Sequence, residues 1–585
     1  MQIPHNLLQN IRKSIFFYIL ALISLTSVNT FAQQIFSGNS YPLMDFRSPL
    51  DIAPPALAGS FGELRANHFH SGIDFRTNQR TGYPVYAVAD GYISRLRVQN
   101  SGFGLALYID HPNGYTSVYG HLSRFGPKIA TAVKDIQYRN KSYEIDEFPS
   151  ADFMPVRKGE VIAYTGNTGS SGGPHLHFEL RDTKTEVTIN PQLLGIQIPD
   201  HISPVIYAMY VYRLNEKPFN EFTPKQYFQV VGAHGKYNLN KVQTIHVSGE
   251  VGFGITTTDK HDGLSGTNGV YSIELELDNK IIYTSALERF SFENSKAINS
   301  HIDYPAFISL KRSIQKSFVD PGNPLQIYSN LINSGRITFN DERLHQLKYT
   351  ITDAKGNKSL LTFNVLADSK AVINTPALPK GIGFPYNKEN EYFNGEIKVL
   401  LPKGTLYNDL NFSYKKLPKP QQNAFSDIHQ VQNKLIPLHK GFELWIKADS
   451  TLAKNQQKAL IVNTNRVSQG GYFENGYVKA LPKNFGSFFI AIDTIAPVIT
   501  PVNITPNKNM SGLSKMNFKI RDNLSGIKSF NGYIDGKWIL MEFDAKTANL
   551  WHTFDERTLA GKHNFELIVV DMKDNINRYV IDFYR

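Results

Sequence analysis

Three short strings, far apart in the sequence, contain residue types that bind metal ions and move protons. They are HSGID (residues 70–74), YGH (119–121) and HLH (175–177). Side chains two or four positions apart on a β-strand share a face, so His70 and Asp74 can converge on one ion, as can His175 and His177. A catalytic zinc ion typically keeps three protein N or O ligands and leaves one position to water. The strings therefore supply three candidate ligands and two further imidazoles, including His121.

Chance must be weighed first, because one histidine in such a string is more often a hydrogen-bonded core or surface residue. With 17 histidines in 585 residues, an H-x-H pair arises by accident in roughly every second chain of this length. The context strengthens the case. YGH follows Asn113-Gly114, a strong hairpin signal, and HLH follows the turn-forming segment 165–174. The intervening residues are apolar, as a core-facing side requires: Ile73, Phe75, Leu176 and Phe178.

The three strings resemble the LytM/lysostaphin-type zinc metalloendopeptidases, which cut peptide bonds in bacterial cell walls. That family has H-x-G-x-D, then H-L after a hairpin, then G-x-T-G-x-S-x-G-x-H-L-H-F-E. This chain has HSGIDF, YGHLS and GNTGSSGGPHLHFEL, and the match covers roughly residues 42–195. The resemblance implies zinc ligands at His70, Asp74 and His177 and catalytic histidines at His121 and His175. Family members that have lost activity usually lack some of these residues, whereas all five are present here.

The chemistry also follows from the residue types. A bound zinc ion lowers the pKa of water from about 15.7 toward 7. A ligand set with one carboxylate leaves the site net positive, which favours a developing oxyanion. The leaving amine of a peptide bond needs a proton, and imidazole titrates in a suitable range. His121 and His175 could orient the water, accept its proton or stabilise the tetrahedral intermediate, and the sequence leaves their division of labour open.

Two features depart from the family pattern. His68 stands where the family often has arginine, and both a contact near the site and a structural or solvent-facing role are open. Residues 126–154 look like an insertion between His121 and the loop before His175. Long loops are more often functional than inert, so we expect this one to border the cleft and restrict which cross-linked peptides enter. The alternative is that it packs against the first β module and only stabilises the domain pair.

The N-terminal residues predict export. Arg12 and Lys13 precede an apolar run from residue 14 to about 25, and small residues end at Ala32, which is the layout of a signal peptide over residues 1–32. An uncleaved anchor is the alternative, but the run is short for a membrane span of about 20 residues. The chain has no cysteine, which excludes disulfides, thiolate metal sites and lipid attachment through cysteine. We expect the periplasm or cell envelope of a bacterium.

The net charge of +11 suits an anionic partner, and cell-wall peptides carry free carboxylates. Export argues against nucleic acid, as does the lack of a continuous Lys/Arg tract or aromatic–basic interleaving. We therefore expect a peptidoglycan peptide as substrate, no nucleic acid, and no membrane span after signal removal. An envelope protein bound by the C-terminal modules is a further partner suggested by analogy.

The residues after about 198 read as strands and turns and contain an internal repeat. DHISPVI (200–206) matches DTIAPVI (493–499), and DGLSG (262–266) matches DNLSG (522–526). The repeated units resemble immunoglobulin-like sandwiches. We predict a mainly β protein with a signal peptide (1–32), a lysostaphin-type antiparallel β peptidase domain (40–198), an immunoglobulin-like domain with an insertion (200–368), a β domain of unassigned type (370–490) and an immunoglobulin-like domain (494–585).

Two functions from different classes remain. The favoured one is an exported zinc metalloendopeptidase acting on peptidoglycan, because the ligand and histidine set is complete. The other is a non-catalytic adaptor that binds the wall or regulates another wall hydrolase. In the C-terminal modules, Asp571, Asp574 and Asn575 suggest calcium, although hydrogen-bonded turn residues are the commoner explanation. The three tryptophans are more often core residues than sugar-stacking platforms.

Overall fold

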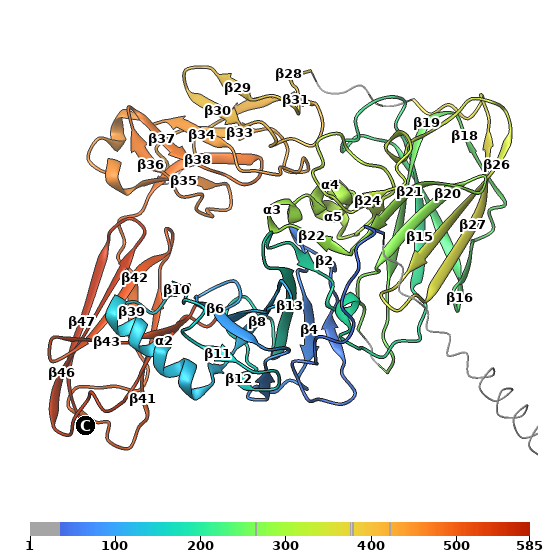
Figure 1. The fold of residues 1–585 in the computed structure, drawn as a ribbon. Coiled ribbons are helices and arrows are strands. Elements are labelled where there is room, and N and C mark those ends of the chain that lie inside the picture. The colour runs from blue at the N-terminus through green and yellow to red at the C-terminus, as the bar shows by residue number, and fades with distance from the viewer. Residues whose placement is uncertain (1–35, 264–265, 375, 377–379, 421–422) are drawn as a thin grey trace, which may run out of the picture.

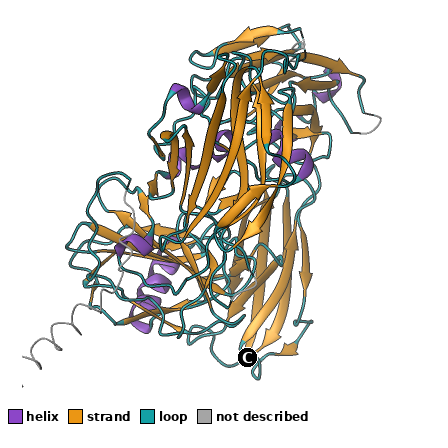
Figure 2. Cartoon of the chain, turned by 90° about the vertical axis from the view of Figure 1, so that its right-hand side faces the viewer, coloured by secondary structure: helices purple, strands orange, loops and turns teal. Residues whose placement is uncertain are grey.

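The computed structural model describes residues 36–263, 266–374, 376, 380–420 and 423–585 (Figure 1). The predicted signal peptide lies outside the described residues. The fold is mainly β, with 44% strand and 8% helix, which confirms the predicted fold class; Figure 2 shows strands running through most of the molecule. None of the helices in the described ranges is long and apolar enough to cross a membrane.

The first large sheet carries the candidate site residues. Along it the strand order is β1-β4-β13-β8-β7-β6-β10, and all neighbours are antiparallel. A small sheet, β5-β12-β9, contributes to the same core. The strands are β1 (Leu57–Gly59), β4 (Ile73–Arg76), β5 (Pro84–Tyr86), β6 (Gly91–Val98), β7 (Leu105–Asp110), β8 (Tyr115–Leu122), β9 (Arg124–Phe125), β10 (Ile145–Glu147), β12 (Val161–Tyr164) and β13 (His175–Asp182).

Along β13, the side chains point alternately into the core and toward the candidate site. Leu176, Phe178 and Leu180 are fully buried in the core beneath the sheet, together with Ile73 of β4. The residues between them belong to the opposite face. The apolar residues that alternate with the candidate ligands therefore face the core, as the sequence predicted, and the polar residues lie on the other side.

The insertion at residues 126–154 is not a long loop. It forms helix α2 (Pro127–Asn140) and edge strand β10, which pairs with β6. Pro127 begins the helix, where its missing N–H costs no hydrogen bond, and Ile129, Val133 and Ile136 are buried at the three- to four-residue spacing of an amphipathic helix. Only three apolar core positions in a segment that is otherwise small, polar or charged made this helical pattern weak in the sequence.

Three further β units follow, each with its own buried core. The first contains a twelve-stranded sheet and short helices, and its strand β22 pairs with β14 of the peptidase part. Strand β14 (Thr188–Ile189) belongs to the first large sheet. The main elements of the first unit are β15 (Val205–Arg213), β16 (Lys225–Ala233), β19 (Gly249–Thr258), β20 (Ser272–Leu277), β21 (Lys280–Ala286), β22 (Arg289–Phe290), α3 (Phe292–Ser295), α4 (Ile298–His301), α5 (Tyr304–Leu310), β26 (Leu344–Thr352) and β27 (Lys358–Ala367).

The second and third units each consist of two main sheets. The second contains β29 (Asn390–Phe393), β30 (Ile397–Leu401), β34 (Glu443–Lys447), β37 (Tyr477–Ala480) and β36 (Tyr472–Glu474), and opposite them β32 (Tyr414–Leu417), β33 (Ile428–Val431), β38 (Gly486–Ile492) and β35 (Ala459–Asn463). The third contains β39 (Val498–Pro501), β41 (Lys515–Arg521), β45 (Asn549–Thr553) and β44 (Glu542–Asp544), with β40 (Lys508–Asn509), β47 (Ile576–Tyr584), β46 (Lys562–Asp571), β42 (Ile527–Ile534) and β43 (Lys537–Ile539).

The chain folds back so that the third unit contacts helix α2 (Figure 1). The Tyr138 ring meets Trp538 edge-on with 5.3 Å between centroids, and Lys134 Nζ lies 2.6 Å from a carboxylate oxygen of Asp555. The expected alternative, packing of the insertion against the first β module, is therefore wrong. Proximity in the sequence suggested contact with the adjacent module. The chain instead folds back and brings the third, most distant unit against the insertion.

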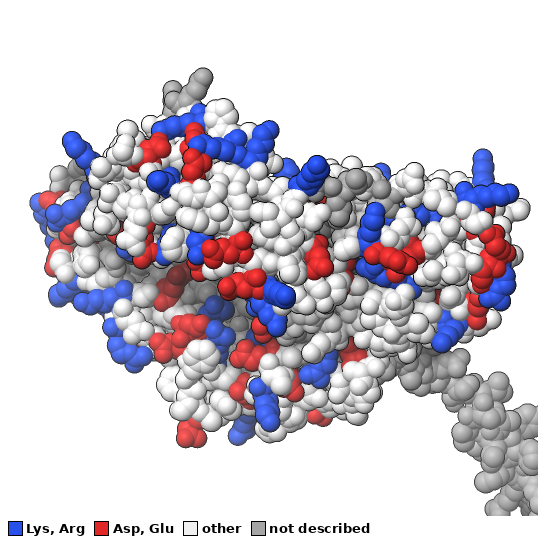
Figure 3. Space-filling model, turned by 90° about the horizontal axis from the view of Figure 1, so that it is seen from above, with Lys and Arg blue, Asp and Glu red and all other residues white. Residues whose placement is uncertain are grey.

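Charged residues of both signs share the surface. On the face seen in Figure 3, basic and acidic side chains are interspersed rather than gathered in one patch. On this face, the excess of positive charge is spread over solvated side chains and forms no continuous basic tract of the kind that nucleic acid needs.

Candidate metal centre and catalytic site

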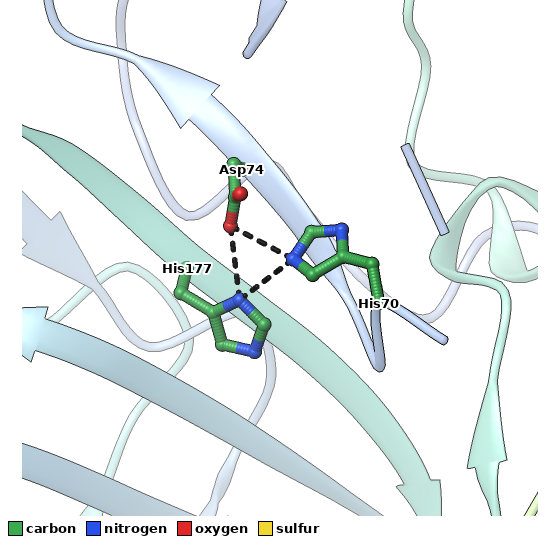
Figure 4. A group of neighbouring side chains, drawn as sticks. All are labelled: His70, Asp74 and His177. Carbon is green, nitrogen blue, oxygen red and sulfur yellow. Dashed lines mark hydrogen bonds and ion pairs between the residues drawn. The ribbon is translucent and has the colours of Figure 1, made fainter. Parts of the chain in front are cut away.

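The five residues selected from the sequence come together at one end of the first sheet. Asp74 of β4 pairs directly with His177 of β13, and His177 pairs on its other side with Gly120 of β8. Directly opposed residues in an antiparallel pair place their side chains next to each other on one face. His70 lies in the turn before β4 and reaches the same point (Figure 4).

His70, Asp74 and His177 form a compact cage of donor atoms. Asp74 Oδ1 lies 3.0 Å from His70 Nε2 and 2.9 Å from His177 Nδ1, and the two nitrogens are 3.1 Å apart (Figure 4). Three donors bound to one tetrahedral zinc at about 2.0–2.1 Å would lie about 3.3 Å from each other. All three residues are buried. The spacing fits a zinc ion after a small outward adjustment.

The second nitrogen of each imidazole shows that the cage needs a positive charge. His70 Nδ1 lies 2.7 Å from the Ser60 carbonyl oxygen, which can only accept, so this nitrogen carries the proton. His177 Nε2 lies 2.9 Å from a carboxylate oxygen of Glu179 and donates to it. The remaining nitrogens then present lone pairs to each other and to the carboxylate of Asp74. Three buried acceptors this close repel one another unless a cation or an additional proton lies among them.

The pKa shifts of His177 and Asp74 likewise indicate that the cage needs a positive charge. Burial lowers the pKa of His177, but hydrogen bonds with Asp74 and Glu179 outweigh it and raise this pKa to about 9. Burial raises the pKa of Asp74, yet the neighbouring His70, His175 and His177 bring it well below its ordinary value. Without metal, the cage therefore holds a proton. A zinc ion would take that proton's place, because ligand nitrogens bind metals only when unprotonated.

Two residues that contact the cage, Glu179 and Arg65, were not predicted from the sequence. Glu179 is fully buried, bonds His177, and accepts from Ser71 Oγ and from Arg181 Nε at 2.7 Å. Burial raises its pKa, but the Arg181 charge and His177 lower it to about 2, so the carboxylate is ionised. A usable sequence signal existed, since residues 175, 177, 179 and 181 share one face of β13.

Arg65, not His68, contacts the metal cage. Its Nη2 donates to Asp74 Oδ2 at 3.0 Å, which leaves Oδ1 directed at the imidazoles. The Arg65 side chain comes from β2 (Leu64–Arg65), which pairs with β3 (His68–Phe69). His68 is exposed, and its Nδ1 lies 3.0 Å from the Ala66 carbonyl oxygen. This geometry agrees with the structural or solvent-facing role left open for His68.

His121 reaches the site through an irregularity in β8. Because Gly120 faces His177, strict alternation would send the His121 side chain to the other face. The register between β7 and β8 shifts here, and His121 has a left-handed φ of 57°. Such bulges re-aim side chains beside active sites. His121 Nδ1 donates to the Thr168 carbonyl oxygen at 2.8 Å, so its other nitrogen is free of that bond.

His121 and His175 stand side by side next to the cage. Their ring centroids are 4.9 Å apart, and His175 Nε2 lies 3.4 Å from Asp74 Oδ1. Burial, and then the charges of His177 and His175, lower the pKa of His121 to about 3, so this ring is neutral and its second nitrogen can accept a hydrogen bond. His175 Nδ1 donates to the Gly173 carbonyl oxygen at 2.8 Å. Both rings thus have one nitrogen fixed and one available.

At Gly72, the glycine of the first string, the structure leaves no room for a side chain. A Cβ there would lie 2.2 Å from the Phe178 carbonyl oxygen of β13. Any larger residue would push the turn that carries His70 away from the strand that carries His177.

Comparisons with known proteins agree with this site. Residues 68–138 and 150–191 match peptidase family M23, and residues 383–493 match a Zu5-like domain. The DD-carboxypeptidase/endopeptidase Mpg of Neisseria meningitidis serogroup B is 35% identical over 23% of this chain and 25% of its own length. The peptidoglycan DD-endopeptidase ShyB of Vibrio cholerae is 30% identical over 25% of this chain and 29% of its own.

Among solved structures, the catalytic domain of lysostaphin from Staphylococcus simulans is 24% identical, with coverage of 23% of this chain and 85% of that domain and a TM-score of 0.17. The matched part spans about a quarter of the length of the curated relatives. The sequence motifs, the sheet and the family match point to one conclusion. The chain contains a peptidase family M23 domain of the LytM/lysostaphin type, as predicted, accompanied by further β units.

Proposed function

We propose that this protein is an exported zinc metalloendopeptidase that hydrolyses peptide cross-links of peptidoglycan. The observation that carries the proposal is that acceptor atoms of His70, Asp74 and His177 face one another in a buried cage. The other nitrogen of each imidazole is hydrogen-bonded to a protein oxygen outside the cage. Relatives named as peptidoglycan DD-endopeptidases support the substrate class. We assign zinc binding to these three residues and catalysis to His121 and His175.

The chain's own residues prepare the reaction around the metal. A zinc ion held in the cage would act as a Lewis acid toward the scissile carbonyl and lower the pKa of a water beside it. His121, neutral and held by Thr168, is suited to accept a hydrogen bond from the attacking water and so to orient it. His175 is more exposed than the ligands and is held by Gly173, which suits contact with the substrate and proton delivery to the leaving amine.

The first test concerns the ligands. Asp74→Ala removes the oxygen that both imidazoles face, so we expect loss of the zinc ion held by this cage and of cleavage of purified wall fragments together. Zinc is counted by mass spectrometry of the metal, and products are identified by mass. A control is His201→Ala, an exposed histidine outside the site. Full zinc occupancy in Asp74→Ala would overturn the ligand assignment; wild-type protein that binds neither zinc nor cleaves the wall would support the adaptor function instead.

The second test separates ligands from catalysts. His121→Ala and His175→Ala leave three-point coordination intact, so we expect both variants to retain zinc. Turnover should fall by about 10²-fold or more, as for a lost acid–base group. If either variant loses its metal, the division of roles among the five residues is incorrect.

Export and the domain division are further parts of the proposal. We assign residues 1–32 to a signal peptide and 40–198, 200–368, 370–490 and 494–585 to the successive domains. The separate cores and the Zu5-like match at 383–493 support this division. N-terminal sequencing of the exported protein should begin at Gln33.

A further inference from the structure

A second group of buried metal-ligating side chains lies where the peptidase domain joins the first β unit. Asp200 is in the connecting segment, Asp259 follows β19, and His261 comes two residues later. All three are buried, and one ligand atom from each lies within 4.8 Å of the others. Asp353, in the turn between β26 and β27, is buried and adds charge next to Asp200 and Asp259.

The His261 ring lies beside both carboxylates without a hydrogen bond to either, while the Asp200 and Asp259 side chains are within hydrogen-bond reach of each other. His261 Nε2 lies 3.6 Å from Asp200 Oδ2 and 3.5 Å from Asp259 Oδ2. These distances exceed the 2.7–3.2 Å of an N–H···O hydrogen bond. They are close to the roughly 3.3 Å expected between ligands of one tetrahedral zinc ion.

Unpartnered oxygens give an independent indication of a cation site. Asp259 is 2% exposed, and among the described residues its Oδ1 has no hydrogen-bond partner. Asn268 pairs with Asp259 across an isolated bridge, so the two side chains share a face. Asn268 is 5% exposed, and its Oδ1 likewise lacks a partner in the described part of the chain. Two buried acceptor oxygens without donors are costly unless a cation satisfies them.

The third β unit provides a comparison within the same chain. Asp493 and Asp571 occupy the positions of Asp200 and Asp353: Asn357 donates to both members of one pair, as Asn575 does in the other. Asp522 directly follows β41 as Asp259 follows β19, and the strands share their register.

The two clusters differ in the donors that reach their carboxylates and in the histidine of the first, although Asp522 Oδ1 also lacks a partner among the described residues. In the third unit the D-x-L-S-G loop begins at Asp522 itself, so backbone N–H groups of Leu524 and Gly526 donate to its Oδ2 at 3.0 and 2.7 Å. In the first unit this motif begins three residues later, at Asp262, whose carboxylate instead binds His201. The matched sequence motif had aligned Asp262 with Asp522, whereas the strand register aligns Asp259.

We propose that Asp200, Asp259 and His261 bind a second divalent cation of the zinc class at the junction of the peptidase domain and the first β unit. An imidazole nitrogen beside carboxylates favours zinc over calcium or magnesium, which take oxygen ligands. Next to this site, Lys355 donates to Gln197 Oε1 at 2.9 Å, and thus ties the turn of Asp353 to the connecting segment. The cation fixes the connection between the two domains and has no catalytic role.

The metal content of the full chain tests the proposal. The protein is loaded with zinc, freed of unbound metal on a desalting column and analysed by mass spectrometry of the metal. We expect two zinc ions per chain in wild type and one in Asp259→Asn. Asp74→Ala should also contain one, and the double variant none. Asp259→Asn should retain cleavage of wall fragments, because it leaves the catalytic cage intact, so failure of this proposal and of the peptidase function are distinguishable.

Two controls sharpen the result. Asp262→Asn changes an exposed carboxylate in the same loop, and Asp522→Asn changes the equivalent position of the third unit; both should keep two zinc ions. Zinc should raise the melting temperature of Asp74→Ala, which retains the proposed site, but not that of Asp74→Ala/Asp259→Asn. One zinc ion in wild type, or two in Asp259→Asn, would overturn the proposal.

Discussion

Each of the four imidazoles in the proposed catalytic site has one nitrogen bound to an acceptor outside it. Carbonyl oxygens of Ser60, Thr168 and Gly173 hold His70, His121 and His175, and a carboxylate holds His177. Such bonds fix the tautomer and the ring orientation. The opposite nitrogens are thereby directed at one point before any metal or substrate binds. Glu179 is the charged member of this set, and its negative charge makes His177 a stronger ligand.

Replacing Glu179 with Gln tests that contribution. The amide can still accept from His177, but the buried charge is lost and Arg181 loses its partner. We expect zinc affinity to fall by about 10- to 100-fold, as for other partners of metal-bound histidines. Competition with a chelating dye measures the affinity. Glu186→Gln, on the exposed turn after β13, should leave it unchanged, and an unaltered affinity in Glu179→Gln would show that only the hydrogen bond matters.

Some residues of the site could be predicted from the sequence, and others could not. His70, Asp74, His121, His175 and His177 were predicted because their spacing on short strings is itself the signal. Arg65 was not predicted, since it meets Asp74 only through the turn that brings β2 and β3 beside β4. Contacts between segments without a shared motif depend on the fold, and no local pattern contains them.

At the scale of elements, the loop at 165–174 positions both proposed catalytic histidines. It leads into β13 and so into His175, and its Thr168 carbonyl oxygen accepts from His121. Thr168 Oγ1 donates to the Leu122 carbonyl oxygen at 2.8 Å and accepts from Leu105 N at 3.0 Å. One side chain thus connects the loop to β7 and β8. The glycines and serines of this segment predicted a turn, but these contacts require the neighbouring strands.

Thr168→Ala should misplace His121 without removing metal. It eliminates two hydrogen bonds, each worth about 0.5–1.5 kcal/mol, and loosens the carbonyl that orients the imidazole. We expect kcat to fall by about tenfold at constant zinc content, since a small misplacement of a catalytic group is costly. Thr168→Ser restores the hydroxyl and should recover most of the rate. Equal rates in Thr168→Ala and wild type would exclude this positioning role.

The β units also show what sequence patterns convey. Alternation of apolar residues predicted strands after residue 198, and the repeat predicted that the first and third units are related. The helix α2 was not predicted because its three core residues lie in a polar insertion. The alternative that this insertion packs against the first β module was wrong because the return of the chain is not encoded locally. Domain packing of this kind depends on surfaces such as those of Tyr138 and Trp538.

For the whole molecule, low pH should weaken the junction of the peptidase domain with the first β unit. His301 of α4 is buried, packs against the Phe69 ring at 5.8 Å and contacts Tyr328 and Gln315. Burial lowers its pKa to about 4, against about 6.5 in an unfolded chain. The neutral ring thus contributes stability that is complete above pH 6.5 and is lost as pH falls toward 4.

Melting temperatures across this range test the junction. Wild type should lose more stability between about pH 6.5 and pH 4 than His301→Gln, which cannot titrate there. Other groups titrate in both proteins and cancel in the difference. His234→Gln, at an exposed position of the same unit, should follow the wild-type curve. Parallel curves for wild type and His301→Gln would show that His301 protonation does not affect stability.

The third β unit reaches the catalytic loop itself. Lys546, between β44 and β45, donates its Nζ to the carbonyl oxygens of Asn167 and Ser171, the latter at 3.1 Å. The same unit is held against helix α2 by Tyr138 and Lys134. A module fixed to this loop limits how far it can move when a bulky cross-linked substrate enters. A short peptide needs no such movement.

Lys546→Met keeps the apolar stem and removes the charged contact. We expect kcat/KM for polymeric wall fragments to rise by about fivefold, which corresponds to about 1 kcal/mol, the scale of one net hydrogen bond. Cleavage of a short soluble cross-linked peptide, zinc content and melting temperature should stay near their wild-type values. Lys519→Met, at an exposed position of β41 in the same unit, is the matched control. If the ratio of the two efficiencies is the same in Lys546→Met as in wild type, the third unit does not restrict substrate size through this loop.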